Sequence, residues 1–164
     1  MQHRCLLATS EHWFLQETRS LIKRVLKRMD LSAKSFYAVA DEDTTFVGCF
    51  FELLLAADRS YVLNDPDRPV RLGVTQANEG MYPMSNGLSR LATRFLGAPE
   101  MVPKVIEQGD SFEADTADEL GLATAAPDDI DWDDEVRLAI EERTSFSPDA
   151  LTGMEANLRF PGPE

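Results

Sequence analysis

A single charged side chain interrupts the most apolar stretch of the sequence. Glu52 is the only acidic or basic residue between positions 46 and 57. On a helix its same-face neighbours are small or apolar residues, namely Gly48, Cys49, Leu55 and Ala56. A carboxyl group in such surroundings has a raised pKa, which suits general acid or base catalysis near neutral pH. The alternative is a buried glutamate that pairs with Arg59, Arg71 or Arg90 and has no catalytic role.

The residues just before Glu52 are suited to hold a negative charge. Gly48 lets a substrate approach the backbone closely, and Cys49 presents its amide at the start of the expected helix. Backbone amides in such a position stabilise a developing oxyanion. Cys49 has no histidine near it in sequence, so we expect its thiol to be a small hydrophobe and not a nucleophile.

A second stretch, residues 76–87, is polar and contains Gly, Pro and Asn between an expected strand and an expected helix. Binding and catalytic residues are common on such loops, although ordinary connections have the same composition. Glu79 is its only acid and, taken alone, is expected at the surface. No metal site is expected, because His3, Cys5 and His12 lack metal-ligand spacing.

The elements that position these residues alternate between strands and helices. Short strands are expected at residues 35–40, 61–63, 70–74 and 122–125. Helices are expected at 46–57, at 86–95 with Asn86 as cap, at 100–108, at 116–120, from 131 or 133 to 142, and from Ser147 onward. Strands separated by helices predict an α/β fold with parallel strands joined by right-handed crossovers.

The first helix is expected to follow Ser10, whose hydroxyl is suited to cap it. Apolar residues recur at three- and four-residue spacing and predict its core face, which comprises Phe14, Leu21, Ile22, Val25, Leu26 and Met29. Basic residues fill the opposite face and complement the negative end of the helix dipole; they are Lys23, Arg24, Lys27 and Arg28.

Length and composition exclude several classes of protein. The chain has 164 residues, 43% of them hydrophobic, and a formal net charge of −13. Nucleic-acid binding is not expected, because neutralising phosphates requires a basic surface. No apolar run approaches the roughly 20 residues of a membrane helix, and residues 1–10 carry no export signal. Two cysteines fit the reducing cytoplasm, which we predict as the location.

The charge is distributed unevenly along the chain. Residues 1–35 hold seven basic and three acidic residues, whereas residues 108–164 hold three basic and sixteen acidic ones. An acidic segment of this kind can bind a basic partner. Apolar residues interrupt the acids here, which favours a solvated surface on short helices and loops.

Four segments, in one order along nearly the whole chain, carry a resemblance to a known family. They are His12-Trp13 with Glu17-Thr18, then residues 51–61, residues 82–91 and residues 147–153. With the order strand, Gly turn, buried helix with one Glu, strand, loop and helix, the sequence resembles the enoyl-CoA hydratase (crotonase) superfamily. Within it, the segments are similar to the C-terminal half of the benzoyl-CoA-dihydrodiol lyases, which open the ring of 2,3-epoxybenzoyl-CoA in aerobic benzoate breakdown.

The resemblance implies an α/β fold of the crotonase-like (ClpP/crotonase) type, a spiral of ββα units, incomplete at both ends. It implies one partial domain over residues 1–164. A helix before the core strand (1–34) precedes an active-site core (35–126) and an acidic C-terminal helical segment (127–164). The sequence is therefore expected to be a fragment that lacks the second oxyanion amide of the superfamily.

The resemblance also implies roles for the residues near Glu52. The Cys49 amide, beside Gly48, would hold the thioester carbonyl, and Glu52 would be the acid or base. The position of the superfamily's second glutamate falls on Gln76, whose amide cannot transfer a proton as a carboxylate does.

The loop that follows Gln76 completes the implied site. Asn78 and Glu79 lie close enough in sequence to substitute for the second glutamate. Gly80 and Pro83 belong to the implied substrate-binding loop.

The implied substrate is an aromatic acyl-CoA, with water activated by a carboxylate. The thioester serves as the electron sink, so no metal and no bound organic cofactor is expected, and the protein is expected to be a homo-oligomer. Two alternatives are a hydratase or isomerase of aliphatic acyl-CoA and a non-catalytic remnant that folds only against a partner chain.

Overall fold

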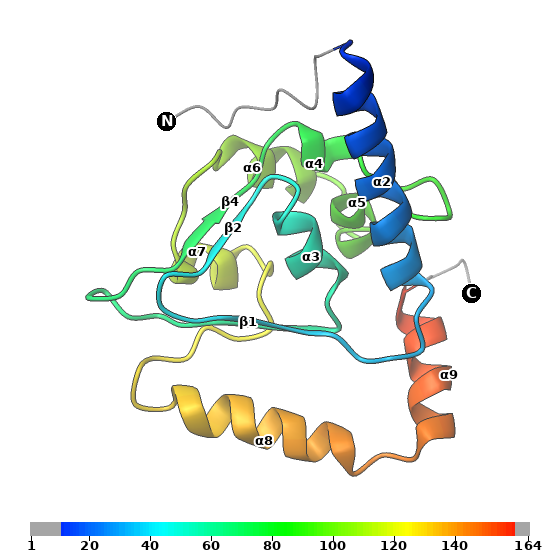
Figure 1. Cartoon of the computed structure of the whole chain (residues 1–164). Coiled ribbons are helices and arrows are strands. Elements are labelled where there is room, and N and C mark those ends of the chain that lie inside the picture. The colour runs from blue at the N-terminus through cyan, green and yellow to red at the C-terminus, as the bar shows by residue number, and fades with distance from the viewer. Residues whose placement is uncertain (1–10, 160–164) are drawn as a thin grey trace.

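The computed structural model describes residues 11–159, which form strands flanked by helices (Figure 1). The first labelled helix, α2 (Trp13–Asp30), is capped by His12, whose Nδ1 accepts a hydrogen bond from the Phe14 amide at 3.3 Å. Ser10, the predicted cap, lies outside the described residues.

The strands are parallel, as the alternation of strands and helices predicted. β1 (Tyr37–Ala40) pairs with β3 (Arg59–Val62), and β2 (Thr45–Val47) pairs with β4 (Arg71–Gly73). The chain runs from β1 through β2 and the short helix α3 (Phe51–Ala56) before it returns to β3. Parallel strands need such a crossover, and α3 lies in the one between β1 and β3 and contacts β2, α2 and α5.

The predicted helix over residues 46–57 is wrong in its first half. Phe46 and Val47 belong to β2, and the helix begins only at Phe51. Between the two elements the chain turns at Gly48, which has φ +60° and whose amide donates to the Gly73 carbonyl at 3.1 Å. The positive φ of Gly48 ends the strand and turns the chain toward the start of α3.

The main core surrounds α3. Phe51 and Leu54 of α3 are fully buried and pack with apolar residues of the strands and of the later helices. Fully buried partners include Val62, Leu72, Leu91, Val105 and Leu122, and the larger Phe112 packs edge-on against Phe51. Glu52 is therefore carried by the most buried helix of the described structure.

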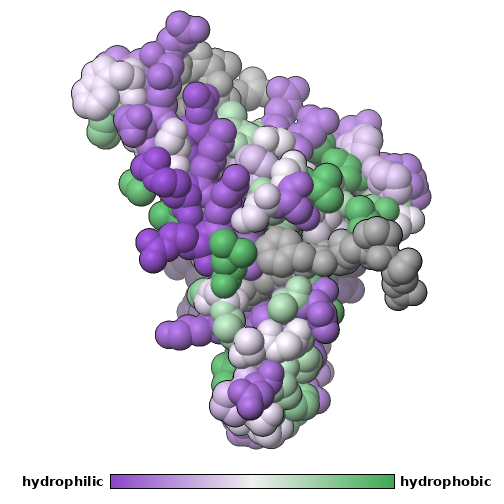
Figure 2. Space-filling view, turned by 90° about the vertical axis from the view of Figure 1, so that its right-hand side faces the viewer, coloured by the Kyte–Doolittle hydropathy of each residue, from purple (hydrophilic) through white to green (hydrophobic). Residues whose placement is uncertain are grey.

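The apolar face predicted for α2 is only partly in the core. Leu26 is buried against Ala77 and Tyr82, with Ile22 and Met29 packed beside them. Phe14, Leu21 and Val25 are instead exposed, which corrects the predicted core face. Figure 2 views the side of the molecule on which α2 lies and shows hydrophobic side chains scattered among hydrophilic ones. The apolar face of α2 is therefore larger than the part of it that packs against the rest of this chain.

The second half of the chain is helical. Its helices are α4 (Ala77–Gly80), α5 (Arg90–Arg94), α6 (Met101–Glu107), α7 (Ala114–Glu119), α8 (Trp132–Thr144) and α9 (Pro148–Arg159). Two predictions in this region are wrong. The helix expected from Asn86 begins at Arg90, because Ser89 is the cap and Asn86 accepts from the Leu88 amide in a turn. Residues 122–125 form a single parallel bridge to Tyr61 in place of a strand.

Charged and polar side chains attach the last two helices, α8 and α9, to the rest of the described structure. Glu155 of α9 pairs with Arg143 of α8, and both side chains contact the Ser35 hydroxyl. These bonds join the α8–α9 pair to the segment that leads into β1 (Figure 1). Within residues 11–159, no helix is long and apolar enough to cross a membrane.

Candidate active site

Glu52 lies in the first turn of α3, two residues beyond the turn that contains Gly48 and Cys49. Its side chain is 1% exposed. An ionised carboxyl at this depth requires hydrogen-bond donors for both oxygens. Two side chains from distant parts of the sequence supply them.

The first donor is Asn78, a buried residue of α4. Its Nδ2 donates to Glu52 Oε1 and to the Gly48 carbonyl, both at 2.8 Å. Its Oδ1 accepts from the Thr75 amide at 2.9 Å. Asn78 therefore ties the Gly48 turn, α3 and the segment after β4 to one another.

The second donor is Arg90, the first residue of α5. Its Nη1 donates to Glu52 Oε2 at 2.9 Å and to the Tyr82 carbonyl at 3.0 Å. Its Nε and Nη2 donate to Asp30, the last residue of α2, at 3.1 and 2.6 Å. All three charged side chains are at most 3% exposed, so they form a buried triad of two carboxylates and one guanidinium.

The surroundings of Glu52 act on its pKa in opposite directions. Burial raises the pKa and has the largest effect, and the nearby Asp30 raises it further. The hydrogen bond from Asn78 and the charge and hydrogen bond of Arg90 lower it. The pKa of Glu52 is raised on balance, which is the condition expected of a general acid or base.

The structure brings together only some of the predicted site residues. Gly48, Glu52 and Asn78 are joined by hydrogen bonds. Gln76, Glu79 and Gly80 are exposed on or beside α4.

Cys49 and Pro83 lie at intermediate depth. Cys49 packs beside the cluster of Leu26, Ala77 and Tyr82, so α2 covers one side of the turn that carries the proposed oxyanion amide.

The sequence left three arginines as candidate partners of Glu52, and in the structure the partner is Arg90. Arg71 is exposed and donates to the Asp110 carbonyl, and Arg59 is exposed on β3. Asp30 was not predicted. The signal that identifies it is its place four residues after Leu26, on the buried face of an amphipathic helix.

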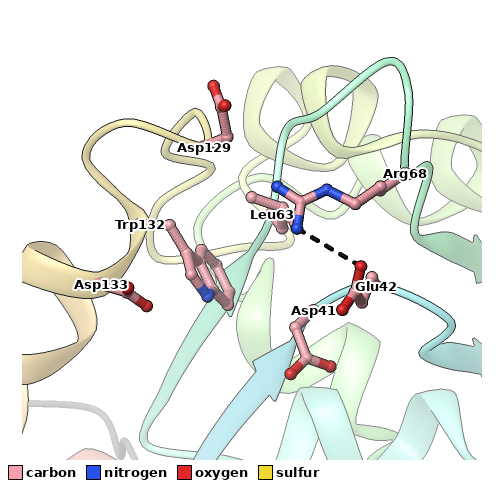
Figure 3. A pocket seen from close by; sticks show the side chains of 7 residues that line it. All are labelled: Asp41, Glu42, Leu63, Arg68, Asp129, Trp132 and Asp133. Carbon is pink, nitrogen blue, oxygen red and sulfur yellow. Dashed lines mark hydrogen bonds and ion pairs between the residues drawn. The ribbon is translucent and has the colours of Figure 1, made fainter.

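Two cavities adjoin charged residues. One, of about 290 Å³, is lined by both Asp30 and Arg90 and by apolar residues at the end of α3. The other, of about 240 Å³, is shown in Figure 3. It lies between the ends of β1 and β3 and the start of α8, and two of its lining residues, Arg68 and Glu42, form an ion pair. Among the described residues, no group of three or more His, Cys, Asp or Glu side chains is arranged to hold a metal ion.

Solved structures of enoyl-CoA hydratases and isomerases share this fold. An enoyl-CoA hydratase/isomerase from Marinobacter aquaeolei superposes with a TM-score of 0.66 at 16% identity, over 89% of this chain and 52% of that chain. An enoyl-CoA hydratase from Bacillus halodurans superposes with a TM-score of 0.65 at 18% identity, over 88% of this chain and 55% of that chain. The chain therefore has the crotonase fold over about half the length of these proteins, which confirms the predicted fold class.

Sequence similarity leads from this class to one relative. The chain is 48% identical over 154 residues to benzoyl-CoA-dihydrodiol lyase of Aromatoleum evansii, which covers 93% of this chain. The chain spans 28% of the length of that relative. The resemblance to the dihydrodiol lyases predicted from four segments is thereby confirmed. No protein-family model matches the sequence.

Proposed function

We propose that this chain is the catalytic segment of an acyl-CoA lyase or hydratase that acts on an aromatic CoA thioester. The observation that carries the proposal is the buried Glu52 carboxyl with its raised pKa, three residues after Cys49 in a crotonase fold. The 48% identity to a benzoyl-CoA-dihydrodiol lyase supports an aromatic acyl group. The proposed reaction is ring opening of a 2,3-epoxybenzoyl-CoA type of substrate.

In the proposed reaction, the amide of Cys49 donates to the thioester carbonyl, which serves as the electron sink. Gly48 keeps the approach to this amide open, because it has no side chain. Glu52 removes a proton from water as the water oxygen bonds to a substrate carbon conjugated with the thioester. The carbon–carbon double bond breaks, its electron pair moves onto the thioester carbonyl, and Glu52 returns the proton to carbon as the carbonyl re-forms. Neither a metal ion nor a bound organic cofactor takes part in the proposed chemistry.

The residues that follow β4 form the opposite wall in this proposal. Asn78 holds Glu52 Oε1 and so fixes the carboxyl orientation. Gln76, exposed just before α4, and Glu79, exposed on α4, orient the attacking water, and Gly80 and Pro83 shape the loop against the acyl group. The amide of Gln76 can position water but cannot accept its proton.

One observation favours a second candidate function. Both oxygens of Glu52 already accept hydrogen bonds, from Asn78 and Arg90, in a triad with at most 3% exposure. Such a closed network fits a structural role equally well, with the chain acting as a non-catalytic crotonase-fold unit that binds a partner chain.

Calorimetric titration with benzoyl-CoA, followed by turnover assays, separates the two functions. We expect saturable binding of benzoyl-CoA that is tighter than that of straight-chain crotonyl-CoA. We expect Glu52→Gln to weaken binding and to reduce turnover by about 10²-fold or more, the contribution of general acid–base catalysis. Glu107→Gln, a change at an exposed acid of α6, is the control and leaves both unchanged.

Three other results would contradict the proposed function. Turnover that survives Glu52→Gln would show that the acid–base assignment is wrong. A cooperatively folded chain that fails to bind benzoyl-CoA would favour the non-catalytic unit. Tighter binding of crotonyl-CoA would favour an aliphatic hydratase or isomerase.

We propose that the chain works in the cytoplasm and associates with further copies of itself. Phe14, Leu21 and Val25 form an exposed apolar stripe on α2 with Arg24 and Arg28 beside it. On α8, the half-exposed Leu138 is surrounded by acidic side chains, which are Asp134, Glu135, Glu141 and Glu142. A basic apolar face and an acidic apolar face are complementary, so α2 of one copy is proposed to pack on α8 of the next.

Sedimentation velocity over a range of concentrations tests this association. Leu138→Asp is expected to shift the chain toward monomer, whereas Leu96→Asp is not. Both leucines are 53% exposed, and Leu96 lies outside α2 and α8. A wild-type chain that sediments as a monomer at every concentration would contradict the proposed association.

A further inference from the structure

Asp30 is a buried acid that the proposed chemistry does not use. It ends α2, its side chain is 3% exposed, and it faces the guanidinium of Arg90. Burying a carboxylate is costly unless it is paired, so its position requires a partner that stays in place. That partner is also a hydrogen-bond donor to Glu52.

The donors of Arg90 are divided unequally between the two acids. Nε and Nη2, which form one edge of the guanidinium, both donate to the Asp30 carboxylate. Nη1 is shared between Glu52 Oε2 and the Tyr82 carbonyl. Glu52 therefore receives one hydrogen bond from Arg90, where a bidentate pair would supply two.

This division matters because a bidentate arginine pair stabilises an ionised carboxylate more than a single hydrogen bond does. If Arg90 were released from Asp30, its two-donor edge would be available to turn toward Glu52. Asp30 also acts through its charge, because a second carboxylate nearby opposes ionisation of the first. The groups that face Glu52 are Asp30 from α2, Arg90 from α5 and the neutral Asn78 from α4.

We propose that Asp30 is a positioning residue for Glu52: it holds one edge of the Arg90 guanidinium, limits Arg90 to a single hydrogen bond to Glu52, and so keeps that carboxyl able to exchange a proton. The catalytic meaning of this arrangement rests on the proposed function of Glu52. The effect of Asp30 on the titration of Glu52 does not depend on it.

The test is a carbon-13 NMR titration of the full chain with labelled glutamate carboxyls. Glu52→Gln identifies the Glu52 signal by its loss. In Asp30→Asn we expect the midpoint of the Glu52 signal to move to lower pH. Asp30→Glu keeps the charge and is expected to keep the midpoint closer to that of the wild type than Asp30→Asn does.

A control separates this effect from simple destabilisation of α2. Leu26→Ala weakens the packing of the same helix, one turn earlier, without removing a charge. It is expected to lower the stability of the fold and to leave the Glu52 midpoint in place. If Asp30→Asn does not fold, Asp30→Ser gives the same readout, since the adjoining cavity of about 290 Å³ admits water to Arg90.

A folded Asp30 variant whose Glu52 midpoint is unchanged, or moves to higher pH, would overturn the proposal. Turnover supplies a second readout. If the chain is active, the acidic limb of the kcat profile of Asp30→Asn moves to lower pH together with the NMR midpoint, with KM little changed. If the chain is inactive, the proposed function fails while the NMR titration still decides the role of Asp30.

Discussion

At Glu52, burial and hydrogen bonding act against each other, and burial has the larger effect on the pKa. Because the pKa is higher in the folded than in the unfolded chain, the folded state binds this proton more tightly. The stability that Glu52 contributes is therefore present at low pH and is lost as the pH rises through the folded pKa. We expect the free energy of unfolding of the wild type to fall relative to that of Glu52→Gln as the pH rises.

Urea unfolding of the two proteins, from about pH 4 upward, measures this difference. The comparison with Glu52→Gln removes the contributions of all other titrating groups that the two proteins share. A difference that stays constant with pH, or that grows in favour of the wild type, would contradict a raised pKa.

Arg90 gives a second prediction at this scale. Arg90→Met leaves Asp30 and Glu52 buried without their shared cation, so we expect a loss of about 3–5 kcal/mol of stability. Arg137 is a matched control, because it also pairs with two acids, Asp134 and Glu141, but is 54% exposed. Arg137→Met is expected to cost about 1 kcal/mol or less, as measured by urea unfolding. Equal losses in the two variants would contradict the buried role of Arg90.

The burial of Glu52 and its pairing with an arginine are predictable, because an isolated charge in an apolar stretch has few explanations. The sequence predicts the partner only as one of three arginines, since pairing across the fold depends on how α5 packs against α3. Asp30 and Asn78 show the same limit. Their bonds to Arg90 and Glu52 span 60 and 26 residues of sequence, distances at which local patterns carry no information.

Among the elements, those with clear turn or cap residues are predicted best. β1, α6 and α9 fall close to their expected ranges. The stretch 46–57 is misassigned because an unbroken apolar run has no period by which a strand and a buried helix can be distinguished. Gly48 marks the boundary between β2 and α3, but its positive φ is not visible in sequence.

β4 depends on close backbone contact, which gives a prediction at the scale of elements. A Cβ atom added to Gly73 would lie 2.5 Å from the Asp110 carbonyl oxygen, so β4 and the segment that follows α6 must separate in Gly73→Ala. We expect a loss of about 1–3 kcal/mol, typical of overpacking, in urea unfolding. Gly97→Ala, where nothing lies within 4 Å of the added atom, is expected to be neutral or slightly stabilising. If Gly73→Ala left the free energy of unfolding unchanged, the close contact between Gly73 and Asp110 would not constrain β4.

The described molecule has two parts of unequal burial. The strands, α3 and α5 to α7 share one core, whereas α8 buries only Ala139 among its side chains, and α9 contributes the buried Glu155. The α8–α9 pair is held by the contacts of Arg143, Glu155 and Ser35, by the Tyr37 hydroxyl, which donates to the Ala139 carbonyl, and by Trp132, which packs against the core. The acidic, helical character of this segment is predictable from composition, but the part that the buried Glu155 takes in its attachment is not.

This attachment predicts that the α8–α9 pair opens as a unit. Glu155→Gln removes a charge-assisted bond worth about 1.5–3 kcal/mol, so amide exchange in α8 and α9 is expected to become roughly ten- to hundredfold faster. Amide exchange in β1, β3 and α3 is expected to stay unchanged, because the main core that these elements share does not contain Ser35, Arg143 or Glu155. Glu141→Gln, at an exposed ion pair of α8, is the control and is expected to have little effect. Hydrogen exchange followed by mass spectrometry resolves these segments, and equal acceleration in β1 and β3 would mean that α8 and α9 unfold only with the whole molecule.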